Sequence, residues 1–461
     1  MDADLRSIAA ARRAAERAWE AHLAFRSAPT SEIDSIVEAM ARAIEPEARR
    51  LAQLAVDETG HGNVPDKRIK NLFNSLGIAE WLRNVRALGV LWRDEAQKIA
   101  AIGEPMGVVA ALIPVTNPTS TVIFKALSAV KAGNAIVCAP HPRGVKCGVA
   151  TTEVLVRAAE QAGAPPGLIS CLDEVTLQGT LELMRHRRSS VILATGGSDM
   201  VRSAYSAGKP ALAVGPGNVP VYVHRSAADR IGEVAEQIIV SKSFDYGTAC
   251  VAEQTVVADR PVARELRHEM KLRGAYFCTR QEAERLEGVI FERSGGFVIP
   301  NVGQSPSRLA SLAGFDVPSR ARVLVAELAA VGRGVQMSAE KLNPVLGFYE
   351  ARDQAGGIAA AEAVLRYGGW GHTCVLHASD PDAATAYSRL PAGRVLVNTP
   401  ALAGGMGFST AVEPSFMLGT GTSSGSIVSD NVTALHLINI KRVAYESRPW
   451  RDLYELYGEP D

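Results

Sequence analysis

Short apolar runs that alternate with longer helical stretches are the feature that most restricts the fold of this chain. The first runs lie at 107–113, 134–139, 168–172, 190–195, 211–214 and 219–224. Stretches with helical spacing, such as 119–131 and 145–161, lie between them. Strand–helix alternation of this kind predicts an α/β fold with a parallel sheet.

A second block with the same alternation of apolar runs and helical stretches follows residue 250. Its apolar runs lie at 254–258, 322–326, 345–349, 373–377 and 394–398. The spacing predicts a long helix over 227–243, which leads into the turn signal Asp245-Tyr246-Gly247. We therefore expect a second α/β domain, and a loop over the Gly-, Ser- and Thr-rich stretch 404–429. Ahead of both blocks, helical spacing predicts two or three helices over 4–58 and another over 67–85.

Composition narrows the class of protein. The chain has 461 residues, which suggests two or three domains at about 150 residues each. Lys plus Arg and Asp plus Glu both count 49, so bulk electrostatic binding to nucleic acid is not expected. No apolar run approaches the roughly 20 residues that span a bilayer, and the start does not resemble a secretory signal. The six cysteines form no CxxC pair, so we expect free thiols in a reducing cytoplasm and no metal site.

A few residues could carry chemistry. Cys250 follows the turn Gly247-Thr248-Ala249, which could present a thiol as a nucleophile, although a free cysteine is more often structural. Asn117 lies where an apolar run ends and a helix begins, where its amide could stabilise an oxyanion. A simple Asn-Pro turn explains it equally well. Gly196-Gly197-Ser198 could expose backbone N–H groups to a phosphate, but alone this is a weak signal.

Taken together, these segments resemble the CoA-acylating branch of the aldehyde dehydrogenase superfamily, from about residue 5 to residue 445. The order and spacing of many motifs make the resemblance specific. The motifs are Gly103-Glu-Pro-Met-Gly-Val-Val, Pro114-Val-Thr-Asn-Pro-Thr-Ser-Thr, Ala139-Pro-His-Pro-Arg, Ala194-Thr-Gly-Gly-Ser, Ala213-Val-Gly-Pro-Gly-Asn, Ser243-Phe-Asp-Tyr-Gly-Thr-Ala-Cys-Val-Ala-Glu-Gln, Glu340-Lys-Leu-Asn-Pro-Val-Leu, Gly371-His-Thr and Asp430-Asn-Val.

The resemblance implies three structural parts. A Rossmann-like cofactor-binding domain is expected over 1–95 and 107–224, and an α/β catalytic domain over 225–411. A small β oligomerisation element is expected over 96–106 and 431–461, with a strand pair near 96–106 and a strand near 434–444. Strands shared between subunits imply a homodimer or homotetramer.

The resemblance also implies roles for single residues. Cys250 attacks the aldehyde, Asn117 and the Cys250 N–H hold the oxyanion, and a thioester forms on Cys250. His372 matches a histidine near the thiol, although a structural histidine at a strand edge is as good an interpretation. Glu340 matches the position that binds the nicotinamide ribose, with a helix-start carboxylate as the alternative. The remaining cofactor-binding positions are Thr116, His141, Pro142, Gly197 and Ser198.

One absence bears on the acyl acceptor. Hydrolytic relatives carry a water-activating glutamate in the turn that corresponds to 213–218, and this turn contains no carboxylate. Without a general base, attack by water loses about 10²–10⁴-fold, so coenzyme A is the expected acceptor. NAD is the expected oxidant, with NADP open because 141–143 lacks an acidic residue for the ribose 2′-hydroxyl. Relatives commonly have Cys-Gly or Trp-Gly-Gly where this chain has Leu418-Gly-Thr-Gly-Thr-Ser-Ser-Gly425, which leaves the aldehyde undetermined.

Other functions compete with this one. A hydrolytic aldehyde dehydrogenase would form product without coenzyme A, and an acyl-phosphate reductase would require phosphate. A third hypothesis is cargo of a bacterial microcompartment, because acylating relatives can dock to its shell through an amphipathic peptide. The tail 449–457 carries Trp450, Leu453, Tyr454 and Tyr457 at helical spacing, although such a tail more often packs on its own subunit.

Overall fold

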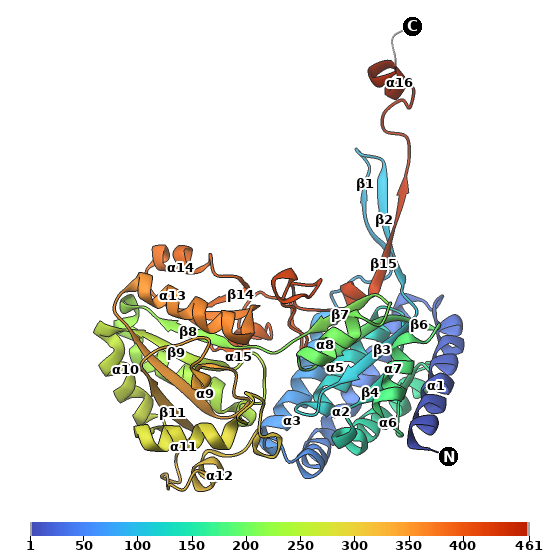
Figure 1. Cartoon of the computed structure of the whole chain (residues 1–461). Helices are drawn as coiled ribbons and strands as arrows, with labels where there is room; N and C mark the ends of the chain where they lie inside the picture. Colours follow the sequence, from blue (N-terminus) through green and yellow to red (C-terminus); the bar gives the residue numbers. More distant parts are fainter. Residues whose placement is uncertain (1, 459–461) are drawn as a thin grey trace.

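The computed structural model describes residues 2–458, and it arranges two α/β units side by side below a projecting arm (Figure 1). Each α/β unit is built on its own sheet, and the arm is a third sheet of three strands. Both larger sheets have only parallel pairing between their strands. The predicted α/β class with parallel sheets is therefore confirmed.

The first unit contains a five-stranded sheet in the order β5-β4-β3-β6-β7. Its strands are β3 (Val108–Ile113), β4 (Ala135–Pro140), β5 (Ile169–Cys171), β6 (Ser189–Thr195) and β7 (Ala211–Val214). Its helices are α1 (Ala3–Phe25), α2 (Thr30–Thr59), α3 (Val64–Leu72), α4 (Ile78–Leu82), α5 (Pro118–Lys131), α6 (Val145–Gln161), α7 (Leu177–Arg185) and α8 (Ser198–Tyr205). The central strand β3 is buried along its whole length, which explains its unbroken apolar run.

The second unit contains a seven-stranded sheet in the order β10-β11-β12-β9-β8-β13-β14. Its strands are β8 (Val219–Val223), β9 (Glu253–Asp259), β10 (Ala275–Phe277), β11 (Val323–Leu328), β12 (Val345–Ala351), β13 (Gly371–His377) and β14 (Ala392–Val397). Its helices are α9 (Ile231–Ser243), α10 (Arg260–Leu272), α11 (Arg280–Ile290), α12 (Pro306–Leu312), α13 (Gln354–Val364), α14 (Pro381–Tyr387) and α15 (Ala401–Gly405).

The change from one sheet to the next corrects the expected boundary at residue 224. Strand β8 pairs with β9 and β13 of the seven-stranded sheet, whereas β7 pairs with β6 of the first sheet. The chain therefore passes between the sheets at 215–218, ahead of β8. Both strands are buried apolar segments, so their composition does not reveal which sheet each one joins.

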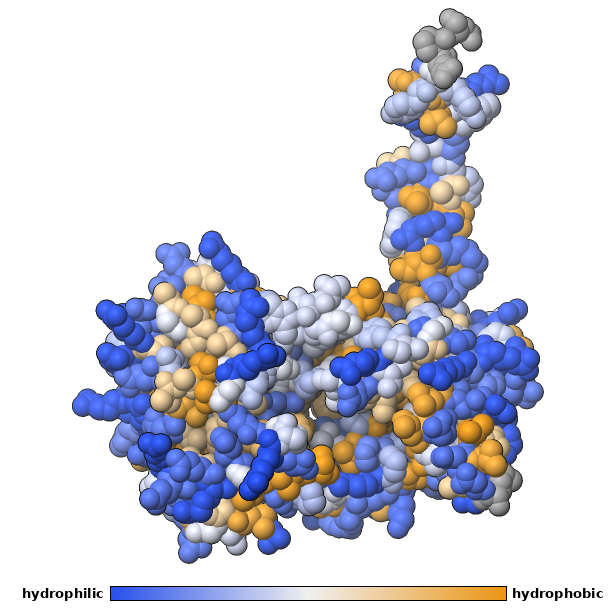
Figure 2. Space-filling model, viewed as in Figure 1, coloured by the Kyte–Doolittle hydropathy of each residue, from blue (hydrophilic) through white to orange (hydrophobic). Residues whose placement is uncertain are grey.

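The arm is an antiparallel sheet in the order β1-β2-β15, built from β1 (Gly89–Asp94), β2 (Ile99–Pro105) and β15 (Ile438–Ala444). The strand pair expected near 96–106 consists of β1 and β2, and its first strand lies ahead of residue 96. β1 and β15 are largely exposed, and apolar residues appear along the arm in Figure 2.

Beyond the arm lies a short helix, α16 (Asp452–Tyr457), which does not reach the two α/β units (Figure 1). The side chains of Trp450, Leu453, Tyr454 and Tyr457 are between 59% and 78% exposed. The tail therefore does not pack on the body of its own subunit. No helix in the described part of the chain has the length and apolar character needed to cross a membrane.

Candidate active site

A cavity of about 610 Å³ lies where the two sheets face each other. The segments that follow β3, β4, β6 and β7 reach it from the first sheet, at the carboxyl ends of those strands. The second sheet contributes the opposite end of its strands, since Cys250 lies just ahead of β9. This volume is typical of a small-molecule site, and the position beyond the carboxyl edge of a parallel sheet is where α/β folds bind ligands.

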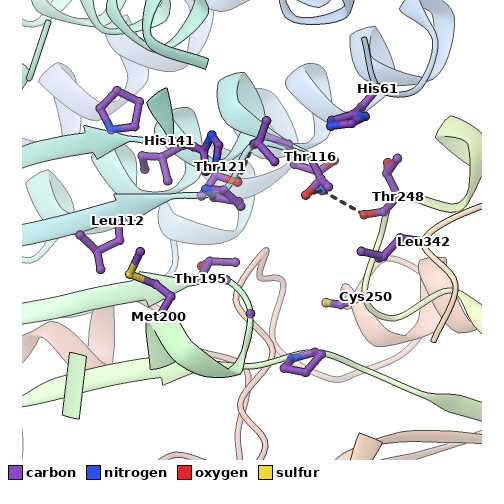
Figure 3. Close-up of a pocket in the computed structure, with 18 of the residues that line it drawn as sticks. His61, Leu112, Thr116, Thr121, His141, Thr195, Met200, Thr248, Cys250 and Leu342 are labelled. Carbon is purple, nitrogen blue, oxygen red and sulfur yellow. Dashed lines mark hydrogen bonds between the residues drawn. The ribbon is translucent and has the colours of Figure 1, made fainter. Parts of the chain in front are cut away.

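The cavity brings most of the predicted site residues together. The predicted residues that line it are Thr116, Asn117, His141, Pro142, Gly197, Ser198, Cys250 and Glu340. His372 does not line it. Figure 3 shows the Cys250 sulfur pointing into the cavity, with Thr116 and His141 on the opposite wall.

The turn ahead of Cys250 has an unusual backbone. Asp245 and Tyr246 have φ angles of 48° and 50°, in the left-handed region that few residues other than glycine adopt. On the other side of the thiol, Gly217 lies so close that a Cβ there would be 2.1 Å from the Cys250 carbonyl oxygen. The position of Cys250 is therefore determined both by its own turn and by the β7–β8 connection.

The Cys250 thiol is protonated at neutral pH in the ligand-free protein. Burial and, to a lesser degree, the nearby Glu340 carboxylate raise its pKa to about 12. Arg394 and Lys70 act in the opposite direction through their positive charges. Arg394 is itself only 5% exposed, and its Nε and Nη1 have no hydrogen-bond partner within the described chain.

Glu340 lies in the loop that precedes β12 and does not begin a helix, so the alternative of a helix-start carboxylate is wrong. Its Oε1 accepts a hydrogen bond of 3.1 Å from the Gly217 N–H. Burial raises the pKa of its carboxyl to about 8, against the opposing effects of the Gly217 N–H, Lys242 and Lys341. Gly217 thus contacts both Glu340 and the Cys250 segment.

His372 is fully buried near the start of β13, beside Gly217. Its Nδ1 lies 3.0 Å from Thr373 Oγ1, and its Nε2 has no partner in the described part of the structure. Burial lowers its pKa to about 3, with a further contribution from Arg394, so the ring is neutral. Its predicted role near the thiol stays a prediction.

The wall formed by the first sheet fits a dinucleotide. A Cβ on Gly197 would meet nothing within 4 Å, so the α8 N-terminus is open to a ligand. No side chain in the described part of the chain caps that terminus, and its free N–H groups favour a phosphate. Thr195 lines the same wall, and its buried Oγ1 has no partner among residues 2–458. His141 and Pro142 lie exposed at the end of β4.

Sequence reasoning missed several residues of this site. His61 lines the cavity, with Nδ1 2.7 Å from the Val302 carbonyl and Nε2 2.7 Å from Arg143 Nη2. Lys70 lies 2.6 Å from Asn117 Oδ1 and 2.6 Å from Asp245 Oδ2. No local motif marks either residue, because their partners lie far away in the sequence.

Comparison with known proteins agrees with this geometry. Residues 2–277 match the aldehyde dehydrogenase family. The chain is 35% identical to the acylating sulfoacetaldehyde dehydrogenase of Cupriavidus necator, over 93% of this chain and 87% of that protein. It is 39% identical to the aldehyde-alcohol dehydrogenase of Clostridium acetobutylicum, over 91% of this chain and 47% of that protein. The chain thus spans about half the length of the aldehyde-alcohol dehydrogenases that it matches.

Solved structures show the same relationship over the whole fold. An acetylating aldehyde dehydrogenase from Geobacillus thermoglucosidasius is 46% identical and superimposes with a TM-score of 0.95, covering 97% of this chain and 98% of that one. A propionaldehyde dehydrogenase from a fucose-utilisation microcompartment of Clostridium phytofermentans is 27% identical, with a TM-score of 0.85 and coverage of 95% and 98%. The chain belongs to the aldehyde dehydrogenase family, within the branch of the acylating enzymes.

Proposed function

We propose that this enzyme oxidises a short, uncharged aldehyde to its acyl-CoA through a thioester on Cys250. The observation that carries the proposal is the β7–β8 connection beside the thiol. In the expected place of a water-activating glutamate, it presents the N–H of Gly217 and no carboxylate. The thioester is therefore left for an external thiol.

The chain's own residues account for the first bond change. The Cys250 sulfur, once deprotonated, attacks the aldehyde carbon and forms a thiohemiacetal with a negatively charged oxygen. Asn117 Nδ2 and the Cys250 N–H are the donors proposed for that oxygen. In the ligand-free structure Asn117 Nδ2 donates to Thr116 Oγ1 at 3.2 Å and to the Thr248 carbonyl at 3.3 Å. Both bonds are long, so an oxyanion can compete for the same protons.

Bound NAD or NADP supplies the hydride acceptor, and the remaining steps concern the thioester. Thr195, Gly197, Ser198 and His141 are proposed to hold the adenosine and pyrophosphate, with Glu340 proposed at the nicotinamide ribose. Coenzyme A then attacks the acyl carbon and releases the Cys250 sulfur. We propose NAD as the main cofactor and some use of NADP, since Arg143 rather than an acidic residue follows Pro142.

Glu340 is a poor substitute for the missing general base. It is the single carboxylate among the described residues that line the cavity. Its pKa of about 8 keeps it mostly protonated at neutral pH, so it cannot take a proton from water there. Hydrolysis of the thioester is therefore disfavoured, and coenzyme A is the acceptor that the site supports.

The lining of the cavity favours an uncharged aldehyde. No lysine or arginine occurs among its described lining residues. The side chains around the thiol are apolar, and they include Val251, Met406, Phe416 and Leu418. A carboxylate or sulfonate on the substrate would lose its hydration there without pairing with a cation of the lining. The 46% identical relative is named as acetylating, which is consistent with acetaldehyde as the substrate.

The test is reduction of NAD or NADP with acetaldehyde, propionaldehyde, butyraldehyde, succinic semialdehyde and sulfoacetaldehyde, with and without coenzyme A. We expect turnover that requires coenzyme A and is fastest with the uncharged aldehydes. Equal turnover to free acid without coenzyme A would contradict the acylating reaction. A requirement for inorganic phosphate would indicate an acyl-phosphate reductase instead. Preference for sulfoacetaldehyde would contradict the substrate class alone.

We propose that the arm joins copies of this chain into a homodimer or homotetramer in the cytoplasm. β15 is an edge strand, and exposed unpaired edges readily pair with another chain. We also keep the prediction that the tail docks to a microcompartment shell, since its apolar side chains are exposed. A reporter fused to 446–461 should then concentrate on assembled shells, and a diffuse reporter would contradict the docking.

A further inference from the structure

We infer that Lys70 is a positioning residue, which orients the Asn117 amide and ties it to the turn that carries Cys250. The inference rests on the proposed role of Asn117 as an oxyanion donor. Lys70 is not part of the cavity wall, and it acts through its contacts with Asn117 and the turn.

Lys70 is fully buried in α3, where its ammonium group meets three acceptors. Its Nζ lies 2.6 Å from Asn117 Oδ1, 2.6 Å from Asp245 Oδ2 and 3.1 Å from Thr248 Oγ1. A lysine ammonium has three protons to donate and accepts none. The three acceptors therefore satisfy all three protons of the Lys70 ammonium group.

The first of these contacts determines which way the Asn117 amide points. The oxygen and nitrogen of an asparagine amide are hard to tell apart except by their partners. Because Lys70 can only donate, the amide atom at 2.6 Å must be the carbonyl oxygen. The NH₂ group is then directed to Thr116 Oγ1 and to the Thr248 carbonyl, two residues before Cys250. The positive charge of Lys70 beside the amide oxygen also makes the amide N–H groups better donors.

The other two contacts connect Lys70 to the nucleophile. Asp245 and Thr248 lie in the turn that leads to Cys250, and the Thr248 hydroxyl also lies 2.8 Å from Asp245 Oδ2. Asn117 follows β3 of the first sheet, whereas this turn precedes β9 of the second. The proposed donors for the oxyanion thus come from two different sheets, and Lys70 bonds to both segments.

The Asp245 carboxylate that contacts Lys70 also pairs with a second lysine. Asp245 also bonds Lys67 Nζ at 3.0 Å, and its Oδ1 accepts from the Asn63 N–H at 2.9 Å. Burial lowers the pKa of Lys70 to about 8, Asp245 and Asp66 raise it, and Lys67 lowers it. The Phe244 ring, 5.6 Å from Nζ, covers another side. Asp245 would therefore keep a buried counter-ion if Lys70 were replaced.

Lys67 offers a matched control for the experiment. It lies on the same helix, is 2% exposed and bonds the same Asp245 oxygen as Lys70. Its other bond goes to the Thr116 carbonyl at 2.8 Å, and no bond joins it to the Asn117 side chain. A general loss of stability or charge should therefore affect both lysine variants, whereas loss of amide orientation should affect Lys70 variants alone.

The experiment is a double-mutant cycle in the full chain, with CoA-dependent aldehyde oxidation as the readout. Lys70→Met and Asn117→Ala should each lower kcat by about 10²-fold, the usual effect of removing one oxyanion donor. The double variant should be no more than about threefold slower than Asn117→Ala, since the two residues act as one unit. Lys67→Met should change kcat by the same factor in the wild type and in the Asn117→Ala variant.

The outcomes separate the inference from the proposed function. Additive effects of Lys70→Met and Asn117→Ala, or equal non-additivity for Lys67→Met, would overturn the inference. Unchanged activity of Asn117→Ala would overturn the oxyanion role itself. Turnover of the wild type without coenzyme A would overturn the proposed function. If Lys70→Met does not fold, Lys70→Gln keeps an amide donor and should show a smaller, equally non-additive loss.

Discussion

At the scale of single residues, the site is a set of buried charges around a thiol. Glu340 raises the pKa of the Cys250 thiol, whereas Arg394 and Lys70 lower it, so each charge should be measurable through the reactivity of the sulfur. Alkylation by iodoacetamide reports this directly, because only the thiolate reacts. No turnover is needed, so these measurements are independent of the acyl acceptor.

Glu340→Gln should make the thiol more reactive and the enzyme less active. With a pKa of about 8, the carboxyl is charged at pH 9 and mostly neutral at pH 7. Removal of the charge should therefore speed alkylation of Cys250 about 3- to 10-fold at pH 9, and much less at pH 7. Oxidation of aldehyde should become slower, because the proposed ribose contact is lost. Equal acceleration at both pH values would contradict this titration.

Arg394→Gln should have the opposite effect on the thiol. The guanidinium is buried, its Nε and Nη1 have no hydrogen-bond partner among residues 2–458, and it lowers the pKa of Cys250. Its loss should slow alkylation at pH 9 by about tenfold, which corresponds to one pKa unit. Arg394→Lys keeps the charge and should stay close to the wild type. Arg225→Gln, which removes a guanidinium bonded to Asp259 at the end of β9, is the control.

The same Glu340 carboxyl predicts how stability changes with pH. Its pKa in the folded chain, about 8, is above the ordinary value of 4.5. The folded state therefore holds a proton that the unfolded chain releases, and rising pH between these values favours unfolding. The Tm of the wild type should fall relative to Glu340→Gln as the pH rises from 5 to 8. A constant difference in Tm across this interval would contradict the raised pKa.

At the scale of elements, the β7–β8 connection is where the two sheets and the thiol meet. Gly217→Ala should push a Cβ to within 2.1 Å of the Cys250 carbonyl oxygen, which forces the turn to move. We expect a loss of about 1–3 kcal/mol in the free energy of unfolding and a large fall in kcat. Gly215→Ala in the same connection is the control, since its Cβ meets only Val201 Cγ2 at 3.8 Å. Thermal melting and steady-state kinetics would show the difference.

The elements also show which parts of the fold can be predicted. Helix α6 spans 145–161 as predicted, and the buried strands lie within about two residues of their apolar runs. β10 was not predicted, and the bounds of β1 were missed because its residues are largely exposed. An exposed strand has no core-facing pattern to read.

The site was predictable only where its residues form local motifs. Cys250, Asn117 and Glu340 lie in recognisable segments, and all three line the cavity. Lys70 and Asp245 are 175 positions apart. From the sequence alone, a buried lysine in an amphipathic helix cannot be distinguished from a solvent-exposed lysine. Their contact exists only because the two sheets face each other. Residues that bridge domains are therefore the part of the site that a single sequence does not reveal.

At the scale of the whole molecule, the arm is the clearest candidate for contact between copies. Trp92 and Ile440 are 46% and 50% exposed on its strands, and the Arg442 guanidinium lies 5.5 Å from the Trp92 ring centre. An apolar surface on an open edge strand is costly in water unless another chain covers it.

Ile440→Lys should therefore weaken assembly. Sedimentation velocity of the wild type should show a dimer or tetramer, and the variant should shift toward the monomer at micromolar concentration. Leu272→Lys, at a position that is 63% exposed in the body, is the matched control and should leave the assembly unchanged. A monomeric wild type would contradict the role of the arm.

The high pKa of the Cys250 thiol also bears on how the enzyme survives between turnovers. Peroxide attacks thiolates rather than thiols, and a thiol with a pKa of about 12 holds almost no thiolate at neutral pH. The resting enzyme should therefore tolerate oxidants that inactivate most cysteine enzymes, and its vulnerability should begin only when a ligand alters the charges around the sulfur.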